Sequence, residues 1–205
     1  MSRLLLVRHG ETKLNSAQRY WGHTDVELSL AGLKQAERLR DYLQAERIDA
    51  IYSSDLKRAC LTAEVIASRH KLGVIICPEL KEIDFGKIEG LTFAEVNHLY
   101  PEVSRLWVKR SAMLKYPGGE SVSHFRQRIL SFIDSYLKGH LQEETILIVA
   151  HSGVLRTIIC HQMNLDFSNM GKIRLDLASL SILEVYPNTA VLSRLNDISH
   201  LEGKV

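Results

Sequence analysis

The sequence has few of the features that mark secreted, membrane-spanning or disulfide-rich proteins. Its 205 residues include only three cysteines, Cys60, Cys77 and Cys160, without a CxxC pair. An odd number of cysteines in apolar surroundings is typical of reduced thiols in a cytoplasmic protein. No apolar run approaches the roughly 18 residues that a membrane-spanning helix needs, and the apolar stretch near the N-terminus is too short for a signal peptide. We therefore expect a cytoplasmic location and no membrane partner.

An excess of charge of one sign is also lacking. The 26 Lys and Arg residues are scattered among 24 Asp and Glu residues, and the formal net charge is +2. Without a basic stripe, the sequence predicts no nucleic acid partner. The nine histidines contain no HxxxH or HExxH pair of the kind that zinc sites use. We therefore expect no metal and no other cofactor, and a monomer or a homodimer.

The pattern of apolar residues predicts a single α/β domain over residues 1–205. Expected strands and helices alternate along the chain. The expected strands lie at 4–8, 48–52, 74–77, 145–150, 179–186 and 190–195, and the expected helices at 30–43, 55–69, 92–99, 102–113, 121–136 and 153–163. Ser29 and Asp55 are the expected N-caps of the first two helices. Helices between strands predict a three-layer α/β/α sandwich with a mainly parallel sheet.

Residues suited to phosphate chemistry follow three of the expected strands. Arg8 and His9 stand at the end of the first strand, Arg58 follows the second, and His151 follows the strand at 145–150. Arginine matches the oxygens of phosphate, and neutral histidine is a nitrogen nucleophile. Because parallel strands end at one edge of the sheet, we expect all four side chains to surround one anion. Mutual repulsion should lower the histidine pKa values and keep His9 neutral.

Six short motifs occur in order along the first 160 residues. They are Leu6-x-Arg8-His9-Gly10-x-Thr12-x-x-Asn15, Leu28-Ser29-x-x-Gly32-x-x-Gln35-Ala36, Ser53-Ser54-Asp55-Leu56-x-Arg58-Ala59-x-x-Thr62-Ala63, Glu82-x-x-Phe85-Gly86-x-x-Glu89-Gly90, Pro117-Gly118-Gly119-Glu120-Ser121 and Val149-x-His151-Ser152-Gly153-x-x-x-Arg156. In type and order they resemble the motifs of the histidine phosphatase superfamily, which contains phosphoglycerate mutases, fructose-2,6-bisphosphatases and alpha-ribazole phosphatases. The resemblance implies a phosphoglycerate mutase-like fold.

The resemblance also implies a mechanism and a set of site residues. His9 would attack the phosphorus of a small-molecule phosphate monoester and form a phosphohistidine, without a metal. Positively charged and polar side chains would hold the phosphate oxygens as charge spreads in the transition state. The phosphate-binding residues implied are Arg8, Thr12, Asn15, Gly22, Arg58, His151 and Ser152.

The proton donor is assigned to Glu82 by the same resemblance. It would protonate the leaving alkoxide and then take a proton from the water that cleaves the phosphohistidine. Asp84 and Glu89 lie nearby and remain alternatives, although Glu89 beside Gly90 is expected to accept structural hydrogen bonds. The role of His23 is left open by the sequence.

The length of the chain favours a phosphatase over a mutase. Only 36 residues, 83–118, lie between Glu82 and Gly119. This leaves no room for the additional segment with which mutases of this family shield the phosphohistidine from water. The sequence does not decide whether residues 85–119 close over the site.

The compact chain resembles the alpha-ribazole phosphatases, which implies alpha-ribazole 5'-phosphate as substrate in cobalamin nucleotide-loop assembly. Its aromatic base would need flat apolar walls. The candidates are Tyr20, Trp21, Tyr100, Trp107 and Tyr116. A broad-specificity sugar or nucleotide phosphatase is the main alternative, ahead of a cofactor-dependent phosphoglycerate mutase. A binding protein without activity is disfavoured because Arg8, His9 and Glu82 are all present.

Overall fold

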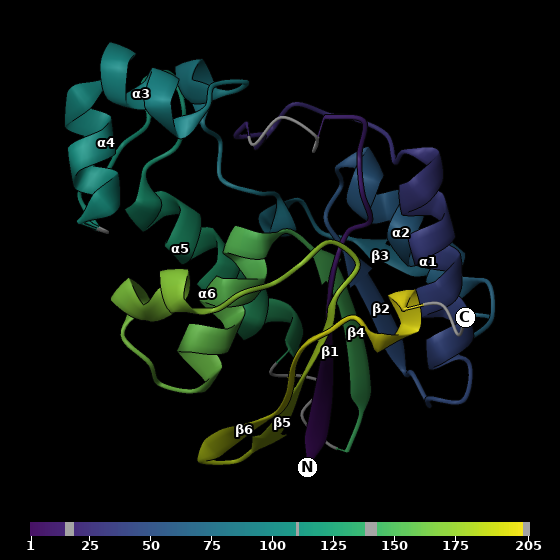
Figure 1. Ribbon diagram of the computed structural model, residues 1–205. Coiled ribbons are helices and arrows are strands. Elements are labelled where there is room, and N and C mark those ends of the chain that lie inside the picture. Colours follow the sequence, from purple (N-terminus) through teal and green to yellow (C-terminus); the bar gives the residue numbers. More distant parts are fainter. Residues whose placement is uncertain (15–18, 110, 138–142, 203–205) are drawn as a thin grey trace.

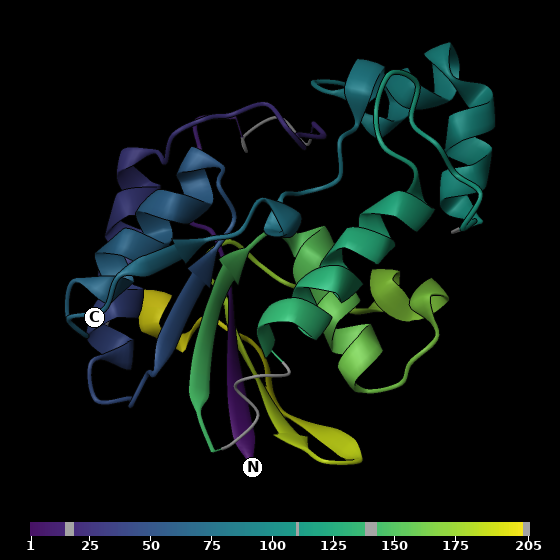
Figure 2. The same ribbon diagram turned by 180° about the vertical axis from the view of Figure 1, so that it is seen from behind.

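The computed structural model is a six-stranded sheet with helices packed on both faces, and it describes residues 1–14, 19–109, 111–137 and 143–202 (Figures 1 and 2). The strands described are β1 (Ser2–Arg8), β2 (Ala50–Ser53), β3 (Val74–Ile76), β4 (Thr145–Ala150), β5 (Leu180–Tyr186) and β6 (Thr189–Asp197). The α-helices described are α1 (Leu30–Leu43), α2 (Lys57–Ala67), α3 (Phe93–Leu99), α4 (Pro101–Val108), α5 (Val122–Phe132) and α6 (Ser152–Gln162). Shorter helical turns are η2 (Pro78–Leu80), η3 (Gly86–Ile88), the π-helical η4 (Ile133–Leu137), η6 (Phe167–Lys172) and η7 (Ser199–Leu201). None of the helices described is both long and apolar enough to cross a membrane.

The strand order is β3-β2-β4-β1-β5-β6, and the first four of these strands are parallel. β5 and β6 add an antiparallel pair at one side. In the register of β1 with β4, Arg8 lies opposite Ala150. His9 and His151 therefore leave the sheet side by side. The mainly parallel α/β sandwich is confirmed.

Residues of β1 alternate between the two faces of the sheet. Leu4 and Leu6 belong to the apolar cluster formed with α5 and α6, whereas Leu5 and Val7 belong to the cluster formed with α1 and α2. Successive strand side chains point to opposite faces, so a strand covered on both sides is apolar throughout. This is why the sequence shows a continuous apolar run here.

Helix starts agree with the sequence prediction at Ser29 and differ at Asp55. Ser29 Oγ accepts a hydrogen bond from the N–H of Gly32 at 3.0 Å and so caps α1. The prediction for Asp55 is wrong, because α2 begins at Lys57 and its N-cap makes no side-chain hydrogen bond. The N–H of Lys57 instead donates to Asp25 at 2.8 Å. A tertiary contact, which a local pattern does not show, replaces the local cap.

The helices α3 and α4 project beyond the carboxyl edge of the parallel strands (Figure 1). An aromatic cluster joins this part of the chain to the body of the domain. The ring centroids of Tyr20 and Trp107 are 4.4 Å apart, and Phe85 lies 5.7 Å from Trp107 and 5.0 Å from Tyr116. These contacts anchor α3 and α4 to the body of the domain.

Candidate active site

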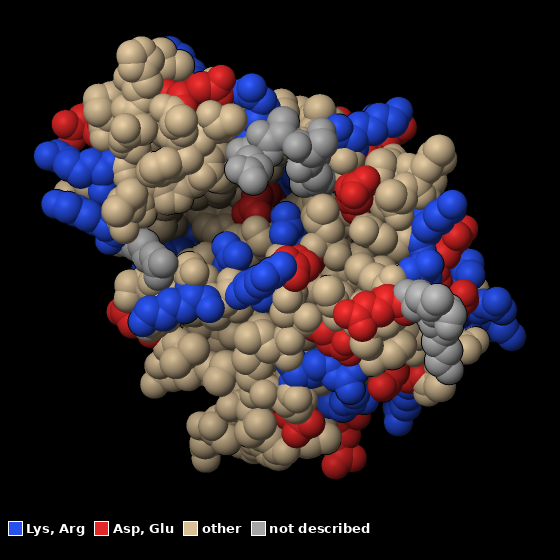
Figure 3. Space-filling model, in the orientation of Figure 1, with Lys and Arg blue, Asp and Glu red and all other residues tan. Residues whose placement is uncertain are grey.

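A cavity of about 530 Å³ opens where the parallel strands end, and Figure 3 shows the hollow with Lys and Arg side chains along it. Seven of the nine predicted site residues line it: Arg8, His9, Thr12, Arg58, Glu82, His151 and Ser152. Gly22 is not among the lining residues, and Asn15 lies outside the residues that the structure describes. The predicted convergence of Arg8, His9, Arg58 and His151 is therefore present in the fold.

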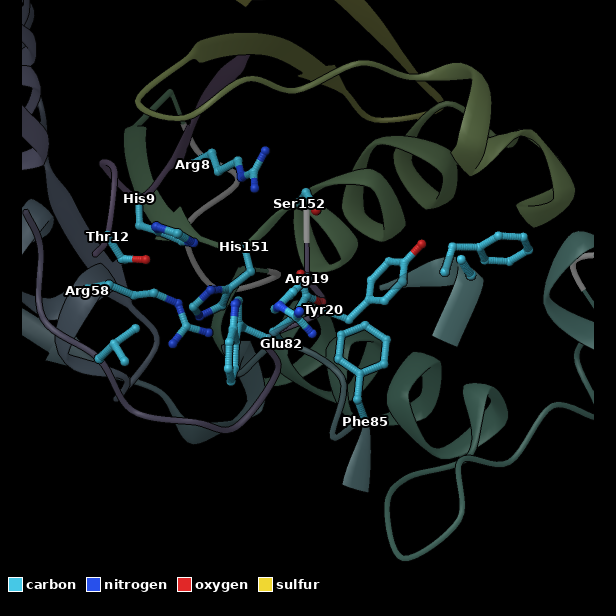
Figure 4. Close-up of a pocket in the computed structure, with 14 residues that line it drawn as sticks. Arg8, His9, Thr12, Arg19, Tyr20, Arg58, Glu82, Phe85, His151 and Ser152 are labelled. Atoms are coloured by element: carbon cyan, nitrogen blue, oxygen red, sulfur yellow. The ribbon is translucent and has the colours of Figure 1, made fainter. Parts of the chain in front are cut away.

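The position of His9 is fixed by hydrogen bonds of its main chain and its ring. Its N–H donates to the carbonyl of Ala150, and its carbonyl accepts from Ala178. The ring Nδ1 is 2.7 Å from the carbonyl oxygen of Gly10, so Nδ1 carries the proton that it donates there. In the neutral ring, Nε2 then holds the lone pair. Figure 4 shows the ring pointing into the cavity together with Arg58 and His151.

His151 faces His9 at a distance of 5.1 Å between ring centroids. Its Nε2 lies 3.0 Å from Ser54 Oγ. Its Nδ1 is buried and has no hydrogen-bond partner among the described residues. A buried polar atom without a partner costs free energy. A bound anion that forms a hydrogen bond with this nitrogen would recover that free energy.

Both histidines are held in the neutral form by their surroundings. Burial is the largest cause that lowers the pKa of His9 well below 6.5, followed by the charges of Arg58 and Arg8. For His151 the pKa is also lowered well below 6.5, by burial first and then by Arg58 and His9. The direction of the pKa shift of His9 is the one that the sequence predicts, although loss of hydration outweighs the charge repulsion on which the prediction relied.

Arg58 is oriented by the carbonyl groups of a neighbouring loop. Its Nη2 donates to the carbonyl oxygen of Gly22 at 2.7 Å, and its Nη1 donates to that of Thr24 at 2.9 Å. That loop is held in turn by Glu89, whose carboxylate accepts the N–H groups of Gly22, His23 and Thr24. Glu89 is thus the structural acceptor that the sequence predicted. Gly22 contributes its carbonyl to Arg58 and does not line the cavity.

Arg8 is the second guanidinium at the floor of the cavity. Its Nη1 donates to the carbonyl oxygen of Leu175 at 2.7 Å. Leu175 lies between η6 and β5, in a segment that also provides the N–H of Ala178 for His9. The approach to β5 therefore helps to fix both residues of the Arg8-His9 pair.

Glu82 is the carboxylate that reaches the cavity. Its Oε1 accepts from the N–H of Ile83 at 3.0 Å, and its Oε2 accepts from the N–H of Gly153 at 3.0 Å. A Cβ atom on Gly153 would lie 2.3 Å from Glu82 Oε1, so only glycine leaves room for this arrangement. Asp84 does not line the cavity, and its Oδ1 accepts from the N–H of Gly86. The geometry favours Glu82 over Asp84 as the acid.

His23 supports the main chain of Glu82. Its Nε2 donates to the carbonyl oxygen of Glu82 at 3.0 Å, and its Nδ1 lies 3.8 Å from Asp84 Oδ2. His23 is not among the residues lining the cavity. The structure thus places His23 against the main chain of Glu82 and outside the cavity lining.

Several lining residues were not identified from the sequence. Arg19, Val26, Phe85, Phe93 and Ala94 line the cavity beside the predicted residues. Arg19 donates to Glu95 Oε2 at 2.9 Å and to the carbonyl oxygen of Gly90 at 2.6 Å. Its position in the site depends on these long-range contacts, and the residues next to it in the sequence gave no signal of them.

A second cavity of about 610 Å³ adjoins the first and shares Tyr20, Glu82, Phe85 and Ser152 with it. Most of its remaining lining is apolar and comes from α4, α5, η6 and the loop 111–116, and its charged side chains are Arg126 of α5 and Arg156 of α6. Of the predicted aromatic candidates, Tyr20 and Trp21 line the first cavity and Tyr20, Trp107 and Tyr116 the second. Tyr100 lines neither of the two cavities.

The neutral histidines make the stability of the fold depend on pH. On unfolding, His9 and His151 regain a pKa near 6.5, so the unfolded chain binds more protons than the folded chain below that pH. The free energy of unfolding should therefore fall as the pH drops from 6.5 to 5.5, by up to about 1.4 kcal/mol per pH unit for each histidine. Urea denaturation in phosphate-free buffer measures this fall. His9→Gln should reduce it, with the exposed His98→Gln as control, and an unchanged fall in His9→Gln would contradict a neutral His9.

Comparison with known proteins places the chain in a family. Residues 4–198 match the model of the histidine phosphatase superfamily (branch 1). The chain is 37% identical over 201 residues to phosphoserine phosphatase 1 of Hydrogenobacter thermophilus, which covers 98% of this chain and 95% of that protein. It is 32% identical over 194 residues to the adenosylcobalamin/alpha-ribazole phosphatase of Escherichia coli, which covers 95% of each.

A solved structure agrees with these matches. The crystal structure of the alpha-ribazole phosphatase from Shigella flexneri has a TM-score of 0.86 to this chain at 32% identity, and it covers 95% of this chain and 96% of that one. The sheet, the helices on its two faces and the six motifs therefore have one explanation. The chain belongs to the histidine phosphatase superfamily and has its phosphoglycerate mutase-like fold.

Proposed function

We propose that this protein is a phosphate monoester hydrolase that forms a phosphohistidine on Nε2 of His9. The observation that carries the proposal is the state of His9. The ring is buried, its pKa is lowered by burial and by Arg58 and Arg8, and its Nδ1 proton is engaged by the Gly10 carbonyl. A neutral imidazole with Nε2 unprotonated is a nucleophile, whereas an imidazolium is not.

In the first step, Nε2 of His9 attacks phosphorus while the bond from phosphorus to the ester oxygen breaks. Arg8 and Arg58 neutralise the phosphate oxygens, and the N-terminus of α6 at Ser152 adds the positive end of a helix dipole. Protonated Glu82 gives its proton to the leaving oxygen. The arginines supply the positive charge that a metal ion supplies in other phosphoryl transfers.

In the second step, water replaces His9 on phosphorus. The Glu82 carboxylate takes a proton from the water, whose oxygen attacks phosphorus as the phosphorus–nitrogen bond breaks. Inorganic phosphate leaves and His9 returns to the neutral form. Glu82 is protonated again and ready for the next substrate.

The nucleophile is tested by substitution and by trapping. His9→Ala should abolish turnover and leave the fold intact, because the substitution removes the nitrogen that attacks phosphorus. Rapid quenching of the wild-type enzyme should trap phosphate that is labile in acid and stable in base, as expected for phosphohistidine. The exposed His98→Ala serves as control. Normal turnover by His9→Ala would rule the mechanism out.

The position of the Glu82 carboxylate is tested by a substitution at Gly153. In Gly153→Ala the added methyl group meets the mobile end of Glu82, so the protein should fold with the carboxylate displaced. The rate on an alkyl phosphate, whose leaving oxygen needs a proton, should fall by about tenfold or more. Gly73→Ala is a matched control, because a Cβ there meets no atom within 4 Å. Full activity of Gly153→Ala on the alkyl phosphate would argue against this placement of Glu82.

The second cavity supports a substrate with a large, flat and apolar group. It adjoins the first cavity at Glu82, the predicted proton donor, and we therefore place the leaving group of the ester in it. Trp107, Tyr116, Phe125 and Phe167 contribute aromatic surface to its lining. A dimethylbenzimidazole base fits such walls, so alpha-ribazole 5'-phosphate is the substrate that we propose.

Phosphoserine is the second candidate, favoured by the 37% identity to phosphoserine phosphatase 1. Its ammonium group needs an anionic partner in the binding site. Among the described residues that line the two cavities, Glu82 is the only carboxylate, and the proposed mechanism uses it as the acid. The lining therefore favours the alpha-ribazole ester as far as the ammonium group is concerned, whereas Arg126 and Arg156 of the second cavity would suit the carboxylate of phosphoserine.

A panel of monoesters assayed in EDTA distinguishes the substrates. For alpha-ribazole 5'-phosphate, kcat/KM should exceed that for phosphoserine and for 3-phosphoglycerate by about tenfold or more, because stacking of a base contributes roughly 1 to 3 kcal/mol. Val108 lines the second cavity and is 69% exposed, so Val108→Asp should lower the preference without unfolding the protein. Val191→Asp, on β6, is the control. Equal kcat/KM values would remove the alpha-ribazole assignment and leave the phosphatase chemistry in place.

A further inference from the structure

Glu82 differs from the other central residues in the kind of structure that carries it. His9 and His151 directly follow strands of the sheet, whereas Glu82 lies in an irregular stretch, residues 81–85, between η2 and η3. Such a stretch has no ladder of main-chain hydrogen bonds to fix it. Its buried carbonyl groups must find other donors, and those donors then determine where the stretch lies.

Arg128 on α5 supplies these donors. Its Nη1 donates to the carbonyl oxygens of Glu79 and Lys81 at 2.6 and 2.7 Å, and its Nη2 donates to that of Glu82 at 2.9 Å. The guanidinium carbon lies 4.8 Å from the centre of the Phe125 ring, and the side chain is 15% exposed. One side chain thus holds three carbonyl groups in the segment that ends at the acid.

Glu120 fixes the orientation of Arg128. Its Oε1 accepts from Nε at 2.8 Å and its Oε2 accepts from Nη2 at 3.0 Å, and its side chain is 8% exposed. Burial raises the pKa of Glu120, but the hydrogen bond and charge of Arg128 outweigh this effect and the pKa is lowered. The Glu120 carboxyl group is therefore ionised at neutral pH. The five hydrogen bonds match the five N–H donors of arginine, whereas lysine has three and no planar fork.

Arg128 is not among the described residues that line either cavity. A role in direct substrate contact therefore has no support in the geometry. The carbonyl of Glu82 is held by Arg128 and also by His23 Nε2, from a different part of the chain. The main chain of the acid is thus fixed by two side chains that do not themselves reach the reacting atoms.

We propose that Arg128, oriented by Glu120, is a positioning residue for the proton donor Glu82. This inference rests on the proposed role of Glu82 as the general acid. The hydrogen bonds of Arg128 to the carbonyl groups of Glu79, Lys81 and Glu82 are called the clamp below. Loss of the clamp lets the Glu82 segment shift, which places the carboxyl group out of reach of the leaving oxygen. Proton transfer requires hydrogen-bond distance, and a displacement of about 1 Å costs on the order of a hundredfold in rate. The defect is largest for leaving groups that need the proton.

The test measures the first chemical step in Arg128→Lys and Glu120→Gln. Rapid-quench release of the alcohol in a single turnover gives the rate of phosphohistidine formation, free of the later hydrolysis. With glycerol 2-phosphate this rate should fall by about tenfold or more, while with p-nitrophenyl phosphate, whose leaving group hardly needs a proton, it should change less than about threefold. Substrate affinity should be nearly unchanged, because neither residue lines the cavities.

A double substitution separates positioning from a general structural role. Glu82→Gln should show the same dependence on the leaving group, and adding Arg128→Lys to Glu82→Gln should cause no further loss with glycerol 2-phosphate. Arg3→Lys is the matched control, since Arg3 forms a partly buried pair with Glu46 at 2.7 Å at the opposite end of β1. If Arg128→Lys does not fold, Glu120→Gln carries the same comparison.

Two results would overturn the proposal. Equal losses on both esters, or losses that add to that of Glu82→Gln, would mean that Arg128 acts only on the general stability of the domain. A different result identifies failure of the proposed function: if Glu82→Gln itself lowers both rates equally, Glu82 is not the acid and the clamp positions no acid. If the loss in Glu82→Gln depends on the leaving group but the loss in Arg128→Lys does not, the positioning role of Arg128 is rejected and the role of Glu82 as the acid stands.

Discussion

The parallel pairing of β1 with β4 is the constraint on which the site depends. The register places Arg8 opposite Ala150, and the next residue of each strand is a histidine, His9 and His151. Both strands are buried on both faces, so their ends are fixed by the whole core and not by the loops that follow. A slip of one residue would turn every side chain of β1 to the other face of the sheet. The distance between the two histidine rings is therefore protected by the apolar core.

The same burial determines the chemistry at the strand ends. Two histidines and two arginines share one cavity. Burial and the charges of the arginines both lower the pKa values of the histidines, and burial is the larger of the two causes. Arginine keeps its charge under conditions in which histidine loses it, because its ordinary pKa is far higher. The site thus combines positive guanidinium groups with neutral rings. This combination suits an anionic substrate and a nitrogen nucleophile at once.

Irregular segments around this rigid centre are fixed by buried charged side chains. Glu89 gathers the N–H groups of the loop that orients Arg58, and Arg128 gathers the carbonyl groups of the segment that carries Glu82. A single carboxylate or guanidinium can form hydrogen bonds with several main-chain groups. In a strand, each of these groups would pair with one main-chain group of the neighbouring strand. Both kinds of support are built from groups that do not enter the cavity.

Much of the fold and of the centre of the site follows from the sequence. Apolar runs and helical periodicity predict the strands and helices because burial acts on each segment in a regular pattern. The residues after strand ends, His9 and His151, are predicted to meet because parallel strands share an edge. Helix boundaries are less determined: Ser29 caps its helix as predicted, whereas Asp55 does not, because Asp25 from a distant loop serves that end.

The sequence by itself determined the mainly parallel sheet, the family motifs and the four side chains that meet in the first cavity, since each follows from local pattern and strand direction. Only the tertiary structure decided the partners of the irregular segments. Arg19, His23 and Arg128 gave no local signal of these contacts, because Glu95, which Arg19 binds, and Glu82, which His23 and Arg128 bind, lie 46 to 76 residues away in the sequence. Hydrogen bonds over such separations depend on how the whole chain packs. Physical proximity in the folded chain, and not spacing along it, assigns these residues to the site.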